Sequence, residues 1–290
     1  MSISRKLLEP VLELAAADIA PEQYAHAKVM LKDTLAVAMV GRTAPGIPEV
    51  LELEREISSP GPATVMFSGI KLSTPGAVYL NSAMIHAMDF DDVYVGPWLH
   101  CMSVVMPIVL ALGEIGALPG RDVLAALIVG VEAAGKITRA YNQAPKKHNY
   151  FLQTSLLGGF GGVAAASRLL GLTLDQGMDA FGIYYAHASG NRQALLERKL
   201  TKRIQPAIAA RSAMYSTLLA SKGFSGPRYV FEGESGLFQN YTLAEAPAEE
   251  RFARLDERLK FSALGIKKIP TCGIHHPNII AALEIKRAHT

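Results

Sequence analysis

Cysteine is scarce in this chain of 290 residues, and its scarcity excludes one class of protein. Cys101 and Cys272 are the only two, too few for the disulfide scaffold of a small secreted domain. No secretory signal precedes the first expected helix. We therefore expect a reducing setting, namely the cytoplasm.

Charge is also sparse. Charged residues make up 19% of the chain, and the formal net charge is +3. Basic residues stand in scattered pairs without aromatic side chains between them, so we expect no nucleic-acid partner. Long apolar runs are missing too, because Glu114 and Glu132 interrupt them before they reach the roughly 20 residues that span a bilayer. We expect no membrane partner either.

Hydrophobic residues, in contrast, form half of the chain. Their spacing, with Gly, Pro or capping residues at the boundaries, predicts a succession of helices. These are expected over residues 21–41, 75–88, 103–116, 121–141, 154–170, 174–188 and 206–222. Residues 104–112 and 123–131 are apolar nearly all round, which is typical of helices buried in a large bundle. The predicted fold class is therefore mainly α.

Other segments are expected to lie outside helices. Residues 42–74 contain four prolines and are predicted to be irregular, with a short strand or extended arm at 63–67. A further strand is predicted at 261–269. The small-residue run at 158–167 has neither the Gly-x-Gly-x-x-Gly spacing nor the lysine of a nucleotide loop. We interpret it as a surface for close helix–helix packing.

The most informative stretch is residues 86–100, which holds three carboxylates, Asp89, Asp91 and Asp92, and two histidines. The helix expected before it places the acids at or just past a helix C-terminus. There the macrodipole and mutual repulsion both disfavour negative charge. Clustered acids have displaced pKa values, which often serve chemistry. A solvated acidic turn is the alternative interpretation.

Cationic and imidazole side chains complete the inventory. Lys202 and Arg203 lie close to the start of an expected helix, where they favour an anion site, although two solvated surface charges would look the same. His100 precedes an apolar helix, as either a core histidine or a general base. Lys267 ends an apolar run. Cys272 and the histidines after it are too few, at no recognised spacing, for zinc, and no metal is predicted. This set suits proton abstraction next to a carboxylate.

Longer segments resemble the MmgE/PrpD family, which includes 2-methylcitrate dehydratase and cis-aconitate decarboxylase. Two of them are Asn81-Ser-Ala-Met-Ile-His-Ala-Met-Asp-Phe-Asp-Asp92 and Lys267-Lys-Ile-Pro-Thr-Cys272. Between these lie residues 107–114, 130–132, 154–172, 188–190, 201–203 and 223–227, all in family order. The resemblance implies a large helical domain and a smaller α/β lid, with the active site between them. It also implies a homodimer and no organic cofactor or metal.

The resemblance further implies a set of site residues, matched by position. It implies that Asp89 and His100 transfer protons. It also implies that five residues bind the substrate: Lys202, Lys267, Asp92, Arg203 and Cys272.

The chain also departs from the family pattern. Leu152 and Gln205 stand where many members have histidines. The chain stops at Thr290, where family members continue through a full lid. We therefore expect a helical MmgE/PrpD-type domain over residues 1–258 and only the start of a truncated lid over 259–290.

The leading hypothesis is a cofactor-independent lyase or isomerase that abstracts a proton next to a carboxylate of a small organic acid or related biosynthetic intermediate. Its expected partners are that substrate and either a second copy in a homodimer or a second, lid-bearing subunit. The first alternative is a non-catalytic or half-site subunit that needs a partner chain to supply the lid. The second takes Asp89-Phe-Asp-Asp92 as the magnesium-binding motif of a helical prenyl-type cyclase.

Overall fold

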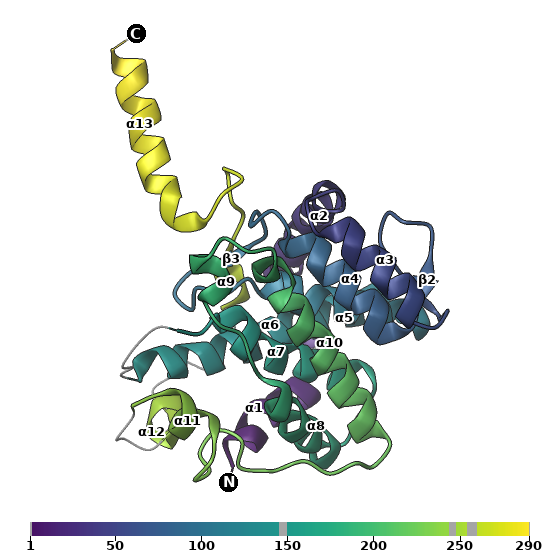
Figure 1. Ribbon diagram of the computed structural model, residues 1–290. Helices are drawn as coiled ribbons and strands as arrows, with labels where there is room; N and C mark the ends of the chain where they lie inside the picture. The colour runs from purple at the N-terminus through teal and green to yellow at the C-terminus, as the bar shows by residue number, and fades with distance from the viewer. Residues whose placement is uncertain (1, 145–149, 244–247, 254–259, 290) are drawn as a thin grey trace.

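The computed structural model describes residues 2–144, 150–243, 248–253 and 260–289. Figure 1 shows a bundle of helices with one helix extending from it. The helices are α1 (Ile3–Glu13), α2 (Pro21–Gly41), α3 (Ile47–Ile57), α4 (Thr74–His86), α5 (Cys101–Ile115), α6 (Gly120–Gln143), α7 (Gln153–Leu169), α8 (Leu174–His187), α9 (Gln193–Leu196), α10 (Thr201–Ser221), α11 (Leu237–Tyr241), α12 (Ala248–Ala253) and α13 (His276–Ala288). Short 3-10 turns are η1 (Ala16–Asp18), η2 (Phe261–Ala263) and η3 (Gly273–His275).

Helix α7 lies at the centre of the bundle. Every residue from Thr154 to Ser167 is buried, so the helix has no solvent face along most of its length. Helices α5, α6, α8 and α10 all pack against it, and α10 also packs along α4 (Figure 1). The centre of the bundle therefore fixes the relative positions of α4, α5 and α10.

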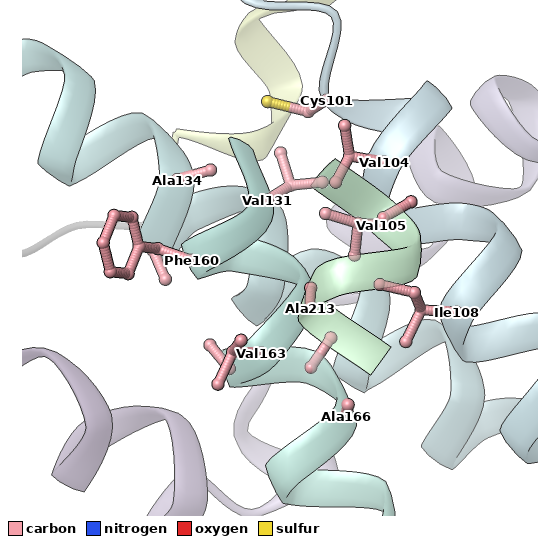
Figure 2. Packing of buried hydrophobic residues seen from close by; sticks show 14 of the residues in the cluster. Cys101, Val104, Val105, Ile108, Val131, Ala134, Phe160, Val163, Ala166 and Ala213 are labelled. Carbon is pink, nitrogen blue, oxygen red and sulfur yellow. The ribbon is translucent and has the colours of Figure 1, made fainter. Parts of the chain in front are cut away.

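Apolar side chains from neighbouring helices fill the space around α7 (Figure 2). Val104, Val105 and Ile108 come from α5, Val131 from α6 and Phe160 from α7 itself. All five are fully buried. Burying a side chain of this size contributes about 1.5–3 kcal/mol, so this core is the main source of the fold's stability.

Glycines let the backbones of α6 and α7 approach each other directly. A Cβ atom on Gly161 would lie 2.4 Å from the backbone oxygen of Gly130, and one on Gly130 would lie 2.8 Å from the backbone oxygen of Gly161. Both distances are shorter than a carbon–oxygen contact allows. The packing role predicted for residues 158–167 is confirmed.

Two small antiparallel sheets accompany the helices. In one, β1 (Ala63–Thr64) pairs with β2 (Lys71–Leu72). In the other, β3 (Val93–Tyr94) pairs with β4 (Leu264–Gly265), with Val93 opposite Gly265. The second sheet joins the acidic stretch to a segment that comes much later in the chain.

Buried polar contacts anchor that later segment to the bundle. Glu132 on α6 accepts hydrogen bonds from the hydroxyl of Tyr94 at 2.9 Å and from the backbone amide of Lys260 at 2.7 Å. His26 on α2 bonds the backbone oxygen of Leu264 through Nε2 at 2.9 Å. Since a carbonyl oxygen only accepts, His26 is the donor. These contacts hold the chain on both sides of η2, just ahead of Lys267.

The mainly α class is confirmed, and α2, α4, α5, α6, α7 and α8 agree with the predicted helices within a few residues. Helix α10 begins at Thr201 rather than at residue 206, because Pro206 lies inside the helix and not in its first turn. The prediction of irregular structure over 42–74 is wrong for α3, whose Pro48 lies in the first turn, where proline is favoured. The strand predicted at 261–269 is wrong except for Leu264–Gly265.

The C-terminal part of the described chain ends in α13, which extends away from the bundle in Figure 1 and has no buried residue. The domain boundary predicted between residues 258 and 259 lies outside the described residues, and the division into two domains stays a prediction. Just after it, Phe261 and Leu264 are buried in the core. Within the described ranges, no helix is both long and apolar enough to cross a membrane.

The contact between α6 and α7 predicts the effect of a single methyl group. We expect Gly161→Ala to lower the free energy of unfolding by about 1–3 kcal/mol, since the added carbon must push two helix backbones apart. Urea denaturation measures this change. Gly120→Ala is the matched control, because a Cβ there meets nothing within 4 Å. Equal stability of the two variants would contradict the packing argument.

Candidate functional site

The loop that follows α4 carries the acidic residues of the site. Helix α4 ends at His86, and Asp89 adopts a φ of 52°, in the left-handed region that aspartate tolerates better than most residues. The backbone amide of Asp89 donates to the carbonyl oxygen of His86 at 3.2 Å. This tight turn places the acids beyond the helix end, as the sequence predicted.

The carboxylate of Asp89 lies between two ammonium groups. Lys202, in the first turn of α10, approaches Oδ2 at 3.2 Å, and Lys267 approaches Oδ1 at 3.1 Å. Lys267 also donates to the backbone oxygen of Asp89 at 2.6 Å. Burial raises the pKa of Asp89, but Lys202 and then Lys267 lower it more, so the net pKa is below the ordinary value. The carboxylate is therefore ionised at neutral pH.

A second chain of contacts runs from Lys202 into the core. Its ammonium nitrogen lies 3.0 Å from Nε2 of His86, whose Nδ1 lies 2.8 Å from Oδ2 of Asp91. Because an ammonium only donates, Nε2 must accept, which leaves the proton of a neutral imidazole on Nδ1, where it is donated to Asp91. Burial raises the pKa of Asp91, but His86 and His100 lower it more, and the net pKa is far below its ordinary value.

His100 occupies the space between the acids. Its Nδ1 lies 2.6 Å from the backbone oxygen of Asp92, so Nδ1 carries the proton and Nε2 is the basic nitrogen. Nε2 lies 3.8 Å from Oδ1 of Asp89, and a fifth of the side chain is exposed. Burial lowers the pKa of His100 to about 4, although Asp91 acts in the opposite direction. At neutral pH the ring is an uncharged base.

Asp92 supports the site by binding the backbone at the start of α5. It is fully buried, and its carboxylate accepts the backbone amides of Cys101 and Met102 at 3.0 Å each, which satisfies two free donors at the start of α5. Burial, and next the charge of Asp91, raise its pKa well above the ordinary value. This geometry gives Asp92 the role of fixing α5, and its predicted contact with substrate stays a prediction.

A pocket of about 320 Å³ opens beside these groups. Residues from the end of α4, from α9 and from the start of α10 line it. They are His86, Ala87, Met88, Asp89, Ala194, Leu195, Arg198, Lys199, Leu200, Lys202 and Arg203. Four of them are cationic and one is a carboxylate, so the pocket favours an anion. The sequence prediction of an anion site at the start of this helix thus coincides with a real cavity.

The structure brings most of the predicted site residues together, but not all. Lys267 contacts Asp89 while its own side chain is only 1% exposed, so it lies behind Asp89 rather than in the pocket. Arg203 lines the pocket and also donates to the backbone oxygen of Pro45. Cys272 is half-buried at the start of η3 and is not among the residues that line this pocket. Its role stays a prediction.

A metal ion fits this geometry poorly. Asp89, Asp91 and His100 offer ligand atoms within 4.8 Å of one another. However, both oxygens of Asp89 already face ammonium groups, and a divalent cation beside them would be repelled. The magnesium-motif alternative meets the same obstacle, and Asp92 is already bonded to the backbone of α5. That the chain needs no cofactor stays a prediction.

Leu152 and Gln205, the two departures from the family histidines, lie close to the site elements. Leu152 is the N-cap residue of α7, two positions before Thr154, whose hydroxyl accepts the backbone amide of His100 at 3.1 Å. Gln205 accepts the backbone amide of Asn191 at 2.8 Å and donates to the backbone oxygen of the same residue at 3.0 Å. Gln205 therefore holds the loop that leads into α9.

Comparison with known proteins agrees with the resemblance. Residues 5–250 match the sequence model of the MmgE/PrpD N-terminal domain. The chain belongs to the MmgE/PrpD family. Two cis-aconitate decarboxylases of Aspergillus terreus are 31% identical over 287 residues and 32% identical over 274 residues, covering 95% and 91% of this chain. A cis-aconitate decarboxylase-like protein, oryM of Aspergillus oryzae, is 30% identical over 244 residues, or 82% of the chain.

These matches cover 58%, 56% and 50% of the relatives' own lengths. The chain thus spans about half the length of the curated relatives it matches. Within the MmgE/PrpD family it corresponds to the helical N-terminal domain and a short segment beyond it.

The sequence did not indicate that His86, or Arg198 and Lys199 in the segment between α9 and α10, belong to the site. His86 was counted within the informative stretch but given no role, although it precedes Asp89 by less than one helical turn. Arg198 and Lys199 form one of the scattered basic pairs of the sequence, and both line the pocket. Their closeness in sequence to Lys202 was the available signal.

The lowered pKa of His100 predicts a pH dependence of stability. The ordinary value is 6.5 and the value in the folded chain is about 4. Between them the unfolded chain binds more protons, so the free energy of unfolding falls as the pH is lowered from about 6.5 to about 4. His100→Gln should flatten this dependence in urea denaturation series. His187→Gln, at an exposed histidine, is the control. An unchanged slope in His100→Gln would refute the assignment.

Proposed function

We propose that this chain carries the proton-transfer site of a lyase that acts on a small carboxylic acid, of the decarboxylase or dehydratase class. The observation that carries the proposal is the ionised Asp89 held between Lys202 and Lys267 beside the basic Nε2 of His100. The relatives supply the class, since they are named as cis-aconitate decarboxylases.

The pocket would bind the substrate through the negative charge of the substrate's carboxylates. A carboxylate that enters beside Asp89 competes with it for the ammonium group of Lys202, and Arg198 and Lys199 offer further donors nearby. Because the cations outnumber the single acid in the lining, a substrate with two or three carboxylates fits better than one with a single carboxylate. The 320 Å³ volume suits a molecule of that size.

His100 would then move the proton. A bound carboxylate adds negative charge next to the ring and raises the pKa of His100, as Asp91 and Asp89 also do. Nε2 is therefore able to take a proton from the carbon next to a carboxylate, as in a dehydratase. The protonated ring is able to return a proton to carbon after loss of carbon dioxide, as in a decarboxylase.

The alternative of a non-catalytic subunit has less support. The two relatives from Aspergillus terreus are named as enzymes. A scaffold has no need for a buried carboxylate, two lysines and two imidazoles, because buried charges stabilise a fold little and cost much to desolvate. A homodimer, or a second subunit that covers the pocket, stays a proposal.

Removing either partner of the central ion pair tests the function. Asp89→Asn and Lys202→Ala are each expected to lower turnover of cis-aconitate by at least about 100-fold, since each removes a charge at the reacting group. Release of carbon dioxide and consumption of the acid measure turnover. Asp175→Asn, which breaks a surface ion pair with Arg228, is the control and should retain full activity. Wild-type rates in both site variants would end the hypothesis.

A separate prediction concerns the mouth of the pocket. Arg198→Ala should raise the KM for a tricarboxylate about 5- to 10-fold and leave kcat unchanged, because Arg198 lines the pocket beyond the reacting groups and binds substrate and transition state alike. Steady-state kinetics with tricarboxylate and monocarboxylate substrates separate the effects. If the KM for the monocarboxylate rises by the same factor, Arg198 does not bind the additional carboxylates of the tricarboxylate.

A further inference from the structure

Two buried side chains next to the pocket, of which His86 lines it, are neither the acid nor the base of the proton transfer proposed above. His86 is 2% exposed and Asp91 is fully buried. They lie on the side of Lys202 that faces the core, and they connect its ammonium group to the interior through two hydrogen bonds of 3.0 and 2.8 Å. The order of groups is Asp91, His86, Lys202 and Asp89.

The partners of His86 define its protonation state. Lys202 needs an acceptor at Nε2, and Asp91, which is ionised, needs a donor at Nδ1. Only the neutral imidazole with its proton on Nδ1 satisfies both. Asp91 therefore selects the tautomer in which His86 is able to accept a hydrogen bond from Lys202.

The same contacts orient the ammonium group. A lysine ammonium has three hydrogens and rotates freely unless its acceptors are fixed. His86 takes one of these hydrogens, and the carboxylate of Asp89 attracts the ammonium group from 3.2 Å; both side chains line the pocket together with Lys202. A further hydrogen is left for an acceptor that enters the pocket.

We propose that His86 is a positioning residue for Lys202, and that Asp91 acts through His86 by fixing its tautomer. The assignment rests on the proposed function in one respect, namely that Lys202 binds the carboxylate of the substrate. It gives the buried pair a role that neither the resemblance nor the relatives assign.

A purely structural role explains the pair less well. Asp91 Oδ1 has no hydrogen-bond partner, although it is buried, and it lies 3.8 Å from Nδ1 of His100. An unpartnered buried oxygen is costly in a core. The cost is explained if the one carboxylate must act on two imidazoles whose rings are 5.2 Å apart: it binds His86 through Oδ2 and acts on His100 through its charge alone.

The tautomer of His86 is the direct test and needs no ligand. Long-range ¹⁵N–¹H correlation spectra of the chain labelled at histidine distinguish a proton on Nδ1 from one on Nε2. His86 should carry it on Nδ1 at neutral pH, and Asp91→Asn should change the two nitrogen shifts because its amide is able to donate to Nδ1. A proton on Nε2, or a doubly protonated ring, would overturn the proposal.

Binding measurements test the consequence for Lys202. We expect His86→Phe to weaken the binding of citrate, a tricarboxylate probe, about tenfold in titration calorimetry. In the Lys202→Ala background the same change should have no further effect, since both changes remove one interaction. Additive losses in the double variant would mean that His86 acts independently of Lys202.

The matched control is Asn81→Ala. Asn81 is buried on the same helix as His86, but its hydrogen bonds go to Met66 and Thr64, near β1. The Asn81→Ala variant should have a lower melting temperature and an unchanged Kd for citrate. If His86→Phe does not fold, His86→Gln replaces it, and the tautomer still decides the question. A chain that shows the tautomer and the coupling but turns over no acid would refute the proposed function and leave the positioning role intact.

Discussion

The pairing of Asp89 with two lysines is the interaction on which the site depends. Three carboxylates follow the C-terminus of α4, where the helix dipole already disfavours them. Each is compensated in a different way. Asp89 faces ammonium groups, Asp91 faces imidazoles, and Asp92 accepts the free amides at the start of α5. Without these partners, the repulsion between the three carboxylates would be uncompensated.

This compensation requires backbone segments that only the helix packing brings together. Lys202 comes from the start of α10, which runs along both α4 and α7. His100 comes from the residue before α5, and its backbone amide is held by Thr154 at the start of α7. Because α7 is buried on all sides and touches α6 through glycine, small shifts in its packing would move several site residues at once.

The sequence was informative about local features and less so about long-range ones. The helices with strong apolar periodicity, the small-residue contact at Gly161 and the acids beyond α4 follow from neighbouring residues. Helix α3 was not predicted because the four prolines of residues 42–74 indicate breaks, whereas Pro48 lies in the first turn of a helix. The roles of Asp92 and His86 depend on partners in other segments, Met102 and Lys202 among them, so no local pattern could assign them. The resemblance implied that Lys267 binds substrate, whereas its buried ammonium group contacts Asp89 from behind; a contact of Lys267 with substrate stays a prediction.

The pairing of β3 with β4 affects the order in which the site assembles during synthesis. Lys267 reaches Asp89 across 178 positions of sequence, and the β3–β4 ladder and the contacts of Glu132 and His26 hold it there. During synthesis from the N-terminus, the loop that contains Asp89 and the helix that contains Lys202 are made before Lys267 leaves the ribosome. In that interval Asp89 has one cation instead of two. The nascent bundle therefore lacks one of the two cations that face Asp89 until the segment that contains Lys267 has been added.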